Sequence, residues 1–195
     1  MTSVQIISTI HRTKMIIARI YYPVTTLGHG KRVGIWVAGC NKNCKNCMSE
    51  NLRSFDSGVA MSIDEICRTI EKIEQEFDGF TISGGEPFLQ IDELVELTER
   101  LSSIYTDDII IYTGYTLEQL EMYNSVIMKR IKNSVSAIID GEYIESLNDG
   151  VGTRGSSNQN VHIFKNHNKH RKLLTQERKV QIIEHKKGIT VIGIP

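Results

Sequence analysis

Apolar residues recur along the chain in two alternating patterns. Short apolar runs bounded by turn residues predict buried strands, and longer stretches with apolar residues at helical spacing predict amphipathic helices. The predicted strands cover residues 32–38, 79–83, 108–113 and 135–140, and the predicted helices cover residues 62–77, 91–104 and 116–131. Strands that alternate with helices of this length imply right-handed crossovers and a parallel sheet, so we expect an α/β fold.

Local signals refine this outline at the helix starts and at both ends of the chain. Ser62 with Glu65 has the spacing of a capping box, and Thr116 with Gln119 caps the third helix in the same way. Residues 15–21 predict an extra strand at one edge of the sheet. The Gly/Ser/Asn-rich residues 150–160 predict an extended loop, and residues 179–184 and 189–194 predict a terminal β-hairpin. No linker or repeat indicates a second domain, so we expect one domain over residues 1–195.

A polar, glycine-rich cluster follows each predicted parallel strand. The four clusters cover residues 40–47, 83–87, 113–115 and 140–143. Parallel sheets and barrels build their sites at the carboxyl ends of their strands. We therefore expect the four clusters to form a single site, with Thr113 and Asp140 as candidate binding residues.

Three cysteines fall within eight residues, in the spacing C-x3-C-x2-C. Thiolates as close as those of Cys40, Cys44 and Cys47 need to be neutralised, and a bound metal does this best. A structural zinc site needs four ligands, and Cys67 lies on the apolar face of a predicted helix. Three ligands suit a cubane 4Fe-4S cluster with one iron open for an exogenous ligand. Structural zinc remains the alternative.

Composition and charge narrow the class of protein. The chain has 195 residues, of which 40% are hydrophobic, a composition typical of one globular domain. It has 23 basic and 23 acidic residues, and this balance argues against a general nucleic-acid binder. No apolar run is long enough for a membrane helix and no secretory signal is evident, so we expect a cytoplasmic protein that does not bind membranes.

The charge is unevenly distributed along the chain. Residues 161–195 contain eight Lys and Arg against two Asp and Glu, an excess of six positive charges that leaves the rest of the chain equally negative. A basic segment of this kind is more often solvated surface than a docking site. Its hairpin offers two further roles, recognition of a partner or closure of a sheet edge.

The cysteine spacing resembles the signature of the radical S-adenosylmethionine (SAM) enzymes. Residues 83–87, Ser-Gly-Gly-Glu-Pro, are similar to the GGE motif with which that family holds the SAM amino group. The resemblance implies that Cys40, Cys44 and Cys47 bind a 4Fe-4S cluster and that SAM occupies the open iron. It also implies SAM contacts for a further set of residues, which are Asn46, Met48, Ser83, Gly84, Gly85 and Glu86. Asn46 and Met48 stand where many members carry aromatic residues, and a Met thioether can pack against the adenine ring.

Further motifs resemble the activating enzymes of anaerobic ribonucleotide reductase. These motifs are Tyr-Tyr-Pro-Val at 21–24, Thr-Gly-Tyr at 113–115, Asp-Gly-Glu-Tyr at 140–143 and Arg-Gly-Ser-Ser-Asn-Gln at 154–159. The resemblance runs from about residue 21 to residue 162 and leaves the basic C-terminal extension, about 164–195, without a counterpart. It implies an open, partial TIM-type β/α barrel and a 5′-deoxyadenosyl radical that takes hydrogen from a glycine of a partner glycyl-radical enzyme. It further implies a reduced flavodoxin or similar electron donor.

Two other functions remain open from the sequence. The first is a radical SAM enzyme that acts directly on a small molecule or peptide. The second is a non-catalytic metal-binding or electron-transfer module, which would hold a fully ligated metal and bind no SAM. With Cys67 alone left over, the chain lacks the cysteines for an auxiliary cluster.

Overall fold

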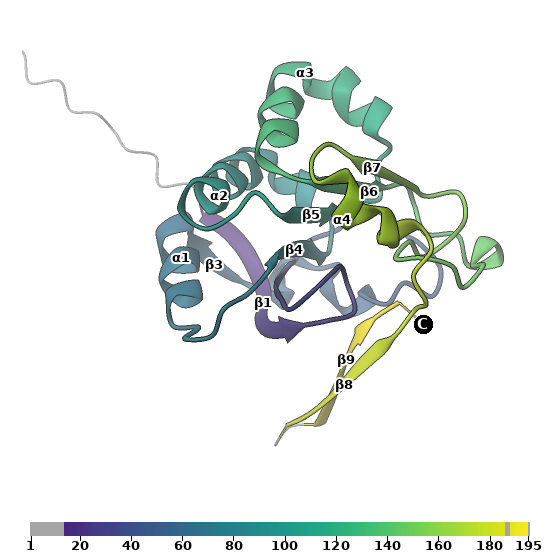
Figure 1. Ribbon diagram of the computed structural model, residues 1–195, viewed down its shortest axis with the longest axis horizontal. Coiled ribbons are helices and arrows are strands. Elements are labelled where there is room, and N and C mark those ends of the chain that lie inside the picture. Colours follow the sequence, from purple (N-terminus) through teal and green to yellow (C-terminus); the bar gives the residue numbers. More distant parts are fainter. Residues whose placement is uncertain (1–13, 186–187, 195) are drawn as a thin grey trace, which may run out of the picture.

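The computed structural model of the protein describes residues 14–185 and 188–194. Most of its strands belong to one sheet, with helices between the successive central strands (Figure 1). The strands are β1 (Lys14–Val24), β2 (Arg32–Val37), β3 (Val59–Ser62), β4 (Gly79–Gly84), β5 (Ile109–Tyr112), β6 (Ala137–Asp140), β7 (Asn160–Ile163), β8 (Val180–His185) and β9 (Gly188–Gly193). The α-helices are α1 (Ile63–Glu71), α2 (Ile91–Ile104), α3 (Leu117–Ser134) and α4 (His167–His170). The 3-10 helices are η1 (Glu50–Leu52), η2 (Phe55–Ser57), η3 (Pro87–Gln90), η4 (Glu145–Leu147) and η5 (Arg171–Leu174).

The main sheet has seven strands in the order β3-β1-β2-β4-β5-β6-β7. The four central strands β2, β4, β5 and β6 are parallel, and they follow one another in chain order. The outer strands β1, β3 and β7 pair antiparallel at the two edges. The expected α/β fold and its four parallel strands are therefore confirmed, within a sheet that is mixed at its edges.

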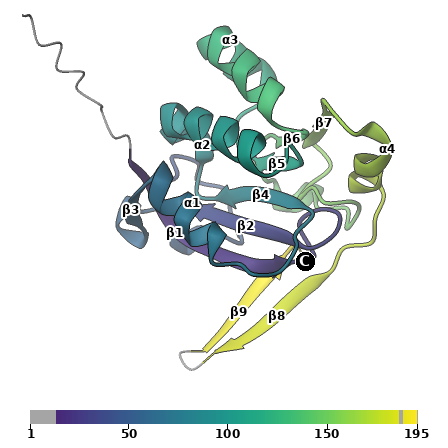
Figure 2. The same ribbon diagram turned by 60° about the vertical axis from the view of Figure 1, so that its left-hand side comes forward.

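The helices α1, α2 and α3 cover one face of the sheet (Figure 2). The core on this face is made of alternate strand residues and of the apolar stripes of the helices, among them Val33, Ile35, Ile82, Ile111, Ile66, Leu94, Leu101 and Ile131. Both expected capping boxes are present, at Ser62 with Glu65 and at Thr116 with Gln119. The first helix ends earlier than predicted, at Glu71, and Phe77 instead packs edge-on against Phe80, with ring centroids 5.1 Å apart.

The C-terminal extension covers part of the opposite face of the sheet. Leu173 of η5 is buried in a small cluster with Ile110, Ala137 and Ile139. Ile192 of β9 is buried in a second cluster that includes Trp36. The predicted hairpin is confirmed as β8 and β9, and it projects from this side of the body (Figure 2). The extension thus supplies core residues as well as surface.

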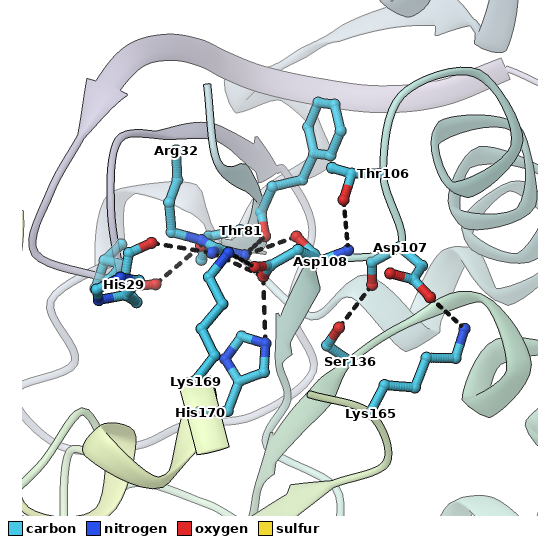
Figure 3. A network of polar contacts seen from close by, with 12 residues as sticks. His29, Arg32, Thr81, Thr106, Asp107, Asp108, Ser136, Lys165, Lys169 and His170 are labelled. Carbon is cyan, nitrogen blue, oxygen red and sulfur yellow. Dashed lines mark hydrogen bonds and ion pairs between the residues drawn. The ribbon is translucent and has the colours of Figure 1, made fainter. Parts of the chain in front are cut away.

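A buried network of charged groups anchors the extension at the amino ends of the parallel strands (Figure 3). Arg32, the first residue of β2, donates to Asp108 Oδ1 at 2.9 Å, and Lys169 of α4 lies 2.5 Å from Asp108 Oδ2. His170 is fully buried, and its Nε2 lies 3.4 Å from Asp108 Oδ1. Arg32 also donates to the Thr81 hydroxyl at 2.8 Å and to three backbone carbonyls. All five guanidinium N–H donors of Arg32 therefore have partners.

The charges of this network shift the acidity of its central carboxyl group. Burial alone would raise the pKa of Asp108, but His170, Arg32 and Lys169 stabilise the carboxylate and hold the pKa well below its usual range. Two other basic residues of the extension pair with acids of the body, Lys165 with Asp107 at 3.0 Å and Arg178 with Asp149 at 3.6 Å. Part of the excess positive charge of the extension is therefore matched within the molecule, which differs from the expected solvated surface.

None of the helices within the described residues has both the length and the apolar character that a membrane-crossing segment needs.

Two short antiparallel strands, β3 and β7, were not predicted from the sequence. Helix α3 has the predicted start but carries a kink, because Asn124 has non-helical dihedral angles of φ −158° and ψ 89°.

Candidate functional site

A pocket lies at the carboxyl ends of the central parallel strands. Ten of the residues expected at the site line it, and they are Cys40, Cys44, Asn46, Cys47, Met48, Ser83, Gly84, Gly85, Glu86 and Thr113. They come from the segments after β2, β4 and β5, which are far apart in sequence. The expected convergence of these clusters at one edge of the sheet is therefore present in the structure.

The three cysteines occupy an irregular loop between β2 and η1. Arg53 holds this loop by donating to the Cys44 carbonyl at 2.6 Å, and Gly39 N–H donates to the Leu52 carbonyl at 2.9 Å. Burial raises the pKa of the Cys40 thiol, and a hydrogen bond from the backbone of Lys42 opposes part of that rise. Burial likewise raises the pKa of the Cys44 thiol. A metal binds the thiolate form, so metal binding would release the protons of these thiols.

The cysteine loop is tied to the segment that follows β6. Lys42 Nζ lies 2.9 Å from Glu142 Oε1 and sits over the ring of Tyr115, 4.1 Å from its centroid. Asn46, which has a left-handed φ of 57°, donates to Glu145 through its side-chain amide. The loops on the two sides of the pocket therefore hold each other in place through polar contacts.

Gly84 and Gly85 are required by neighbouring backbone. A Cβ at Gly85 would lie 2.2 Å from the Gly39 carbonyl oxygen, and a Cβ at Gly84 would lie 2.5 Å from the Val37 carbonyl oxygen. The same segments are joined by hydrogen bonds from Gly85 N–H to Val37 at 2.8 Å and from Glu86 N–H to Gly39 at 2.7 Å. The glycines thus let the turn after β4 pack directly on the start of the cysteine loop.

Glu86 is buried, with 1% of its surface exposed, and it is held by uncharged donors. Its Oε1 accepts from Phe88 N–H at 3.0 Å and from the Thr113 hydroxyl at 2.8 Å, and its Oε2 accepts from Gly114 N–H at 2.7 Å. Burial raises the pKa of Glu86, although these hydrogen bonds and the more distant Lys42 oppose the rise. A carboxylate offers about four acceptor positions, so Oε2 retains capacity for a further donor in the pocket.

Asp140 lies beside the site but does not line the pocket. Its Oδ2 accepts from Leu117 N–H at 2.6 Å and contacts His162 Nε2 at 2.9 Å, while Oδ1 accepts from Asn160 N–H at 3.2 Å. Asp140 therefore joins the start of α3 to the edge strand β7. The role that its contacts support is the positioning of these elements.

Several pocket residues were not among the candidates from the sequence. Tyr112, the last residue of β5, lines the pocket and donates to the Thr153 carbonyl at 3.0 Å. Its place at the end of a parallel strand was the available signal, since that is where such sheets build sites. Four other lining residues belong to the expected clusters, namely Lys42, Gly114, Gly141 and Tyr143. The lining residues outside those clusters are Ser49, Arg53, Asn148, Gly155, Gln159 and Ile194. Ile194 reaches the pocket only through the tertiary packing of the extension, which no local pattern shows.

The pocket is lined by three thiols, a donor set that an iron–sulfur cluster can take. A cubane cluster takes each thiolate on a different iron, so its ligands stand around a common space. Cys40, Cys44 and Cys47 line one pocket, and Cys67 is buried on α1 and does not line it. Among the residues that the structure describes, no group of three Cys, His, Asp or Glu side chains is arranged to hold a single metal ion.

Comparison with known proteins places the chain in a family. Residues 26–162 match the family model of a 4Fe-4S single cluster domain. An anaerobic ribonucleoside-triphosphate reductase-activating protein of Haemophilus influenzae is 31% identical over 153 residues, which cover 74% of this chain and 96% of that protein. Proteins of the same description from Escherichia coli K12 and Enterobacteria phage T4 are 28% and 26% identical, and each alignment covers 73% of this chain, with 95% and 90% of those proteins. The chain therefore belongs to the family of the 4Fe-4S single cluster domain, together with these reductase-activating proteins.

Proposed function

We propose that this protein is a radical SAM activating enzyme of the oxidoreductase type. It cleaves SAM reductively to a 5′-deoxyadenosyl radical, which abstracts hydrogen from a glycine of a partner glycyl-radical enzyme. The observation that carries this proposal is the meeting of three cysteine thiols with a buried carboxylate, Glu86, in one pocket. The names of the relatives support an anaerobic ribonucleotide reductase as the partner.

Cys40, Cys44 and Cys47 are the residues that would hold the 4Fe-4S cluster. When bound, the cluster supplies one electron at low potential and an iron site left open by the protein. The chain contributes the shape of the loop, through the Arg53 contact with the Cys44 carbonyl and the Lys42 contact with Glu142. The reductant that we propose, a reduced flavodoxin or a similar donor, follows from the family resemblance.

Glu86 is the residue that we propose to bind the SAM ammonium group. Its carboxylate is oriented by Thr113 and Gly114 and keeps acceptor capacity at Oε2. A cation at this position would offset the cost of burying the charge, because an opposite charge favours the ionised carboxylate. Ser83, Gly84, Asn46 and Met48 line the same pocket and remain our candidates for further SAM contacts.

The fold suits a reaction on a protein partner. The sequential order of β2, β4, β5 and β6 with helices α1 to α3 on one face supports an open, partial β/α barrel. We propose a single domain in which residues 15–163 form this barrel and residues 164–195 form an extension. The pocket has a volume of about 180 Å³ and lies at the carboxyl ends of these strands.

Anaerobic reconstitution with iron and sulfide tests the proposal directly. The wild-type protein should show cluster absorbance that changes when SAM is added, and dithionite should yield 5′-deoxyadenosine. With purified anaerobic ribonucleoside-triphosphate reductase, electron paramagnetic resonance should show a glycyl radical on the reductase. Repeated release of 5′-deoxyadenosine with no radical on the reductase would favour an enzyme that acts directly on a small molecule or peptide. A fully ligated metal without SAM binding would overturn both readings.

A further inference from the structure

The C-terminal extension reaches the pocket at two points, although it lies beyond the family match that ends at residue 162. Ile194, which follows β9, lines the pocket. Arg178, which precedes β8, contacts the loop formed by residues 148–155. Asn148 and Gly155, at the two ends of this loop, line the pocket as well. The extension therefore touches one wall of the site both directly and through this loop.

Arg178 joins the two ends of loop 148–155. Its guanidinium donates to Asn148 Oδ1 at one end of the loop and to the Arg154 and Gly155 carbonyls at the other end. It also lies 3.6 Å from Asp149 Oδ1, and its side chain is only 7% exposed. A planar guanidinium with several donors in a fixed fork suits this arrangement, because one group can bind several acceptors at once.

The backbone of the extension holds the middle of the same loop. Thr153 N–H and its hydroxyl both donate to the Leu173 carbonyl, at 2.9 and 3.1 Å, and Gly152 N–H donates to the Gln176 carbonyl at 3.2 Å. A Cβ at Gly152 would lie 2.6 Å from the Leu173 carbonyl oxygen, so the two segments are in close contact. Leu173 is itself fully buried, which fixes the segment to the body of the protein.

Loop 148–155 in turn supports the pocket wall. Gln159 Oε1 accepts from Gly155 N–H at 2.7 Å, and Gln159 Nε2 donates to the Gly141 carbonyl at 2.6 Å. Gly155, Gln159 and Gly141 all line the pocket. A displacement of the loop would therefore change the wall that these residues form.

This wall differs in chemistry from the remainder of the pocket. The segments after β2, β4 and β5 carry the thiols and the Glu86 carboxylate. The lining residues after β6 carry no charge, and they are Gly141, Tyr143, Asn148, Gly155 and Gln159, with Ile194 from the extension. The oxygens of both amides are already used within the protein, at Asn148 by Arg178 and Gly150 N–H and at Gln159 by Gly155 and Ser156 N–H. The group that each amide can offer to a bound segment is therefore its NH2, a donor suited to the backbone carbonyls of a polypeptide.

We propose that the C-terminal extension sets the position of this wall, with Arg178 as the positioning residue, and that the wall receives the glycine-bearing segment of the partner protein. The proposal rests on the proposed function for the identity of that segment. Arg178 acts through loop 148–155 and does not touch the reacting groups. The extension thus adapts a shared 4Fe-4S domain to a particular protein substrate.

The test compares Arg178→Ala with Arg178→Lys and with Arg171→Ala in the full-length, reconstituted protein. Arg171→Ala is the matched control, because it removes the same charge from an exposed position of the extension. Hydrogen exchange should be about tenfold faster at residues 150–155 in Arg178→Ala than in the control, because loop contacts are lost. Arg178→Lys should recover part of the protection.

A second measurement distinguishes a defect in positioning the partner from a general loss of activity. In Arg178→Ala, the concentration of purified anaerobic ribonucleoside-triphosphate reductase that gives half-maximal glycyl radical should rise about five- to tenfold, since misplaced binding groups weaken a productive complex. Cleavage of SAM without the reductase should stay within about twofold of wild type, because the acceptors described for Arg178 belong to loop 148–155.

Three outcomes would overturn the proposal. Loop exchange identical in Arg178→Ala and Arg171→Ala would show that Arg178 does not hold the wall. An equal loss of SAM cleavage and radical formation would assign the wall to the cofactor. Failure of the wild type to form a radical on the reductase would show that the reductase is not the partner and would overturn the proposed function. The hydrogen-exchange data would then still decide whether Arg178 positions the loop.

Discussion

The two ends of the parallel sheet each bury a carboxylate, and the surroundings of these carboxylates are opposite. Asp108, at the amino ends of the strands, is 3% exposed and lies against Arg32, Lys169 and His170. Glu86, at the carboxyl ends, is 1% exposed and accepts only from uncharged groups at hydrogen-bond distance. The pKa of Asp108 is lowered and that of Glu86 is raised. The chain neutralises the structural carboxylate with its own cations and leaves the carboxylate of the pocket for a cation from outside.

The largest effect on activity is expected from a substitution in the cysteine loop, at the carboxyl ends of the parallel strands. Cys44→Ala should abolish cluster binding and radical formation, because two thiolates are too few to hold a cubane. Cys67→Ala is the control, since Cys67 is buried on α1 and does not line the pocket. It should retain the wild-type iron content. Iron and sulfide analysis with absorbance spectra checks both variants, and iron lost equally from the two would contradict this assignment of ligands.

Removal of the Asp108 charge, at the amino ends of the parallel strands, should reduce the stability of the fold. Asp108→Asn leaves the fully buried Arg32 without its counter-ion, and breaking such a pair costs roughly 3–5 kcal/mol of unfolding free energy. Urea denaturation of the unloaded protein measures this loss. SAM affinity of the folded, reconstituted fraction should stay at the wild-type value, and a large change in affinity would mean that the two ends are energetically coupled.

The corresponding acid-to-amide substitution of Glu86, at the carboxyl ends of the strands, should leave stability nearly unchanged and weaken SAM binding. Glu86→Gln removes a buried charge and loses one acceptor, so the unfolding free energy should stay within about 1 kcal/mol of wild type. SAM binding should weaken by about 2–3 kcal/mol, or roughly 30- to 150-fold, because a charge-assisted contact with the ammonium is lost. Isothermal titration calorimetry with the reconstituted protein measures the affinity. Unchanged SAM affinity would remove Glu86 from the proposed role.

The pH dependence of stability should distinguish the two carboxylates. The pKa of Asp108 is depressed in the folded protein, so its contribution is present above the unfolded value of about 3.9 and is lost as the pH falls below it. The pKa of Glu86 is raised, so its ionisation opposes folding as the pH rises above about 4.3. The difference curve of Asp108→Asn against wild type should therefore slope below about pH 4, and that of Glu86→Gln should slope with the opposite sign above about pH 4. Slopes of the same sign would contradict the comparison.

The smallest effect is expected where the extension pairs with the body at the surface. Lys165 and Asp107 lie 3.0 Å apart, with side chains 30% and 41% exposed. Lys165→Ala should therefore cost no more than about 1 kcal/mol of unfolding free energy. A loss as large as that of Asp108→Asn would show that burial is not what separates these two ion pairs.

The sequence predicted the features that depend on local pattern. The central strands and helix α2 followed from apolar periodicity, and Ser62 and Thr116 mark true helix starts. The meeting of the cysteines with Glu86 followed from the rule that sites lie at the carboxyl ends of parallel strands, which needs no contact information. Structure that depends on residues close together in the sequence could therefore be predicted.

Features that depend on residues far apart in the sequence could not be predicted from local patterns. Asp108 is expected to be an exposed strand end until Lys169 and His170 are brought to it from the extension. Arg178 is one of several basic residues in a polar stretch, and its role depends on the acceptors of loop 148–155. The short strands β3 and β7 have four residues each, none of them fully buried, and each is defined by its pairing with β1 or β6.

The buried contact between Asp108 and the extension has a consequence for the history of such chains. A gene that loses the terminal segment removes Lys169 and His170 from Asp108 and leaves Arg32 as its neighbour. A gene that acquires the segment brings the cation of Lys169 to within 2.5 Å of this acid. Lys169 and His170 should therefore occur only in chains that carry Asp108. Natural variants that shorten the protein are expected to keep Arg32 and Asp108 as a pair, because Arg32 alone would be a buried cation without an acid.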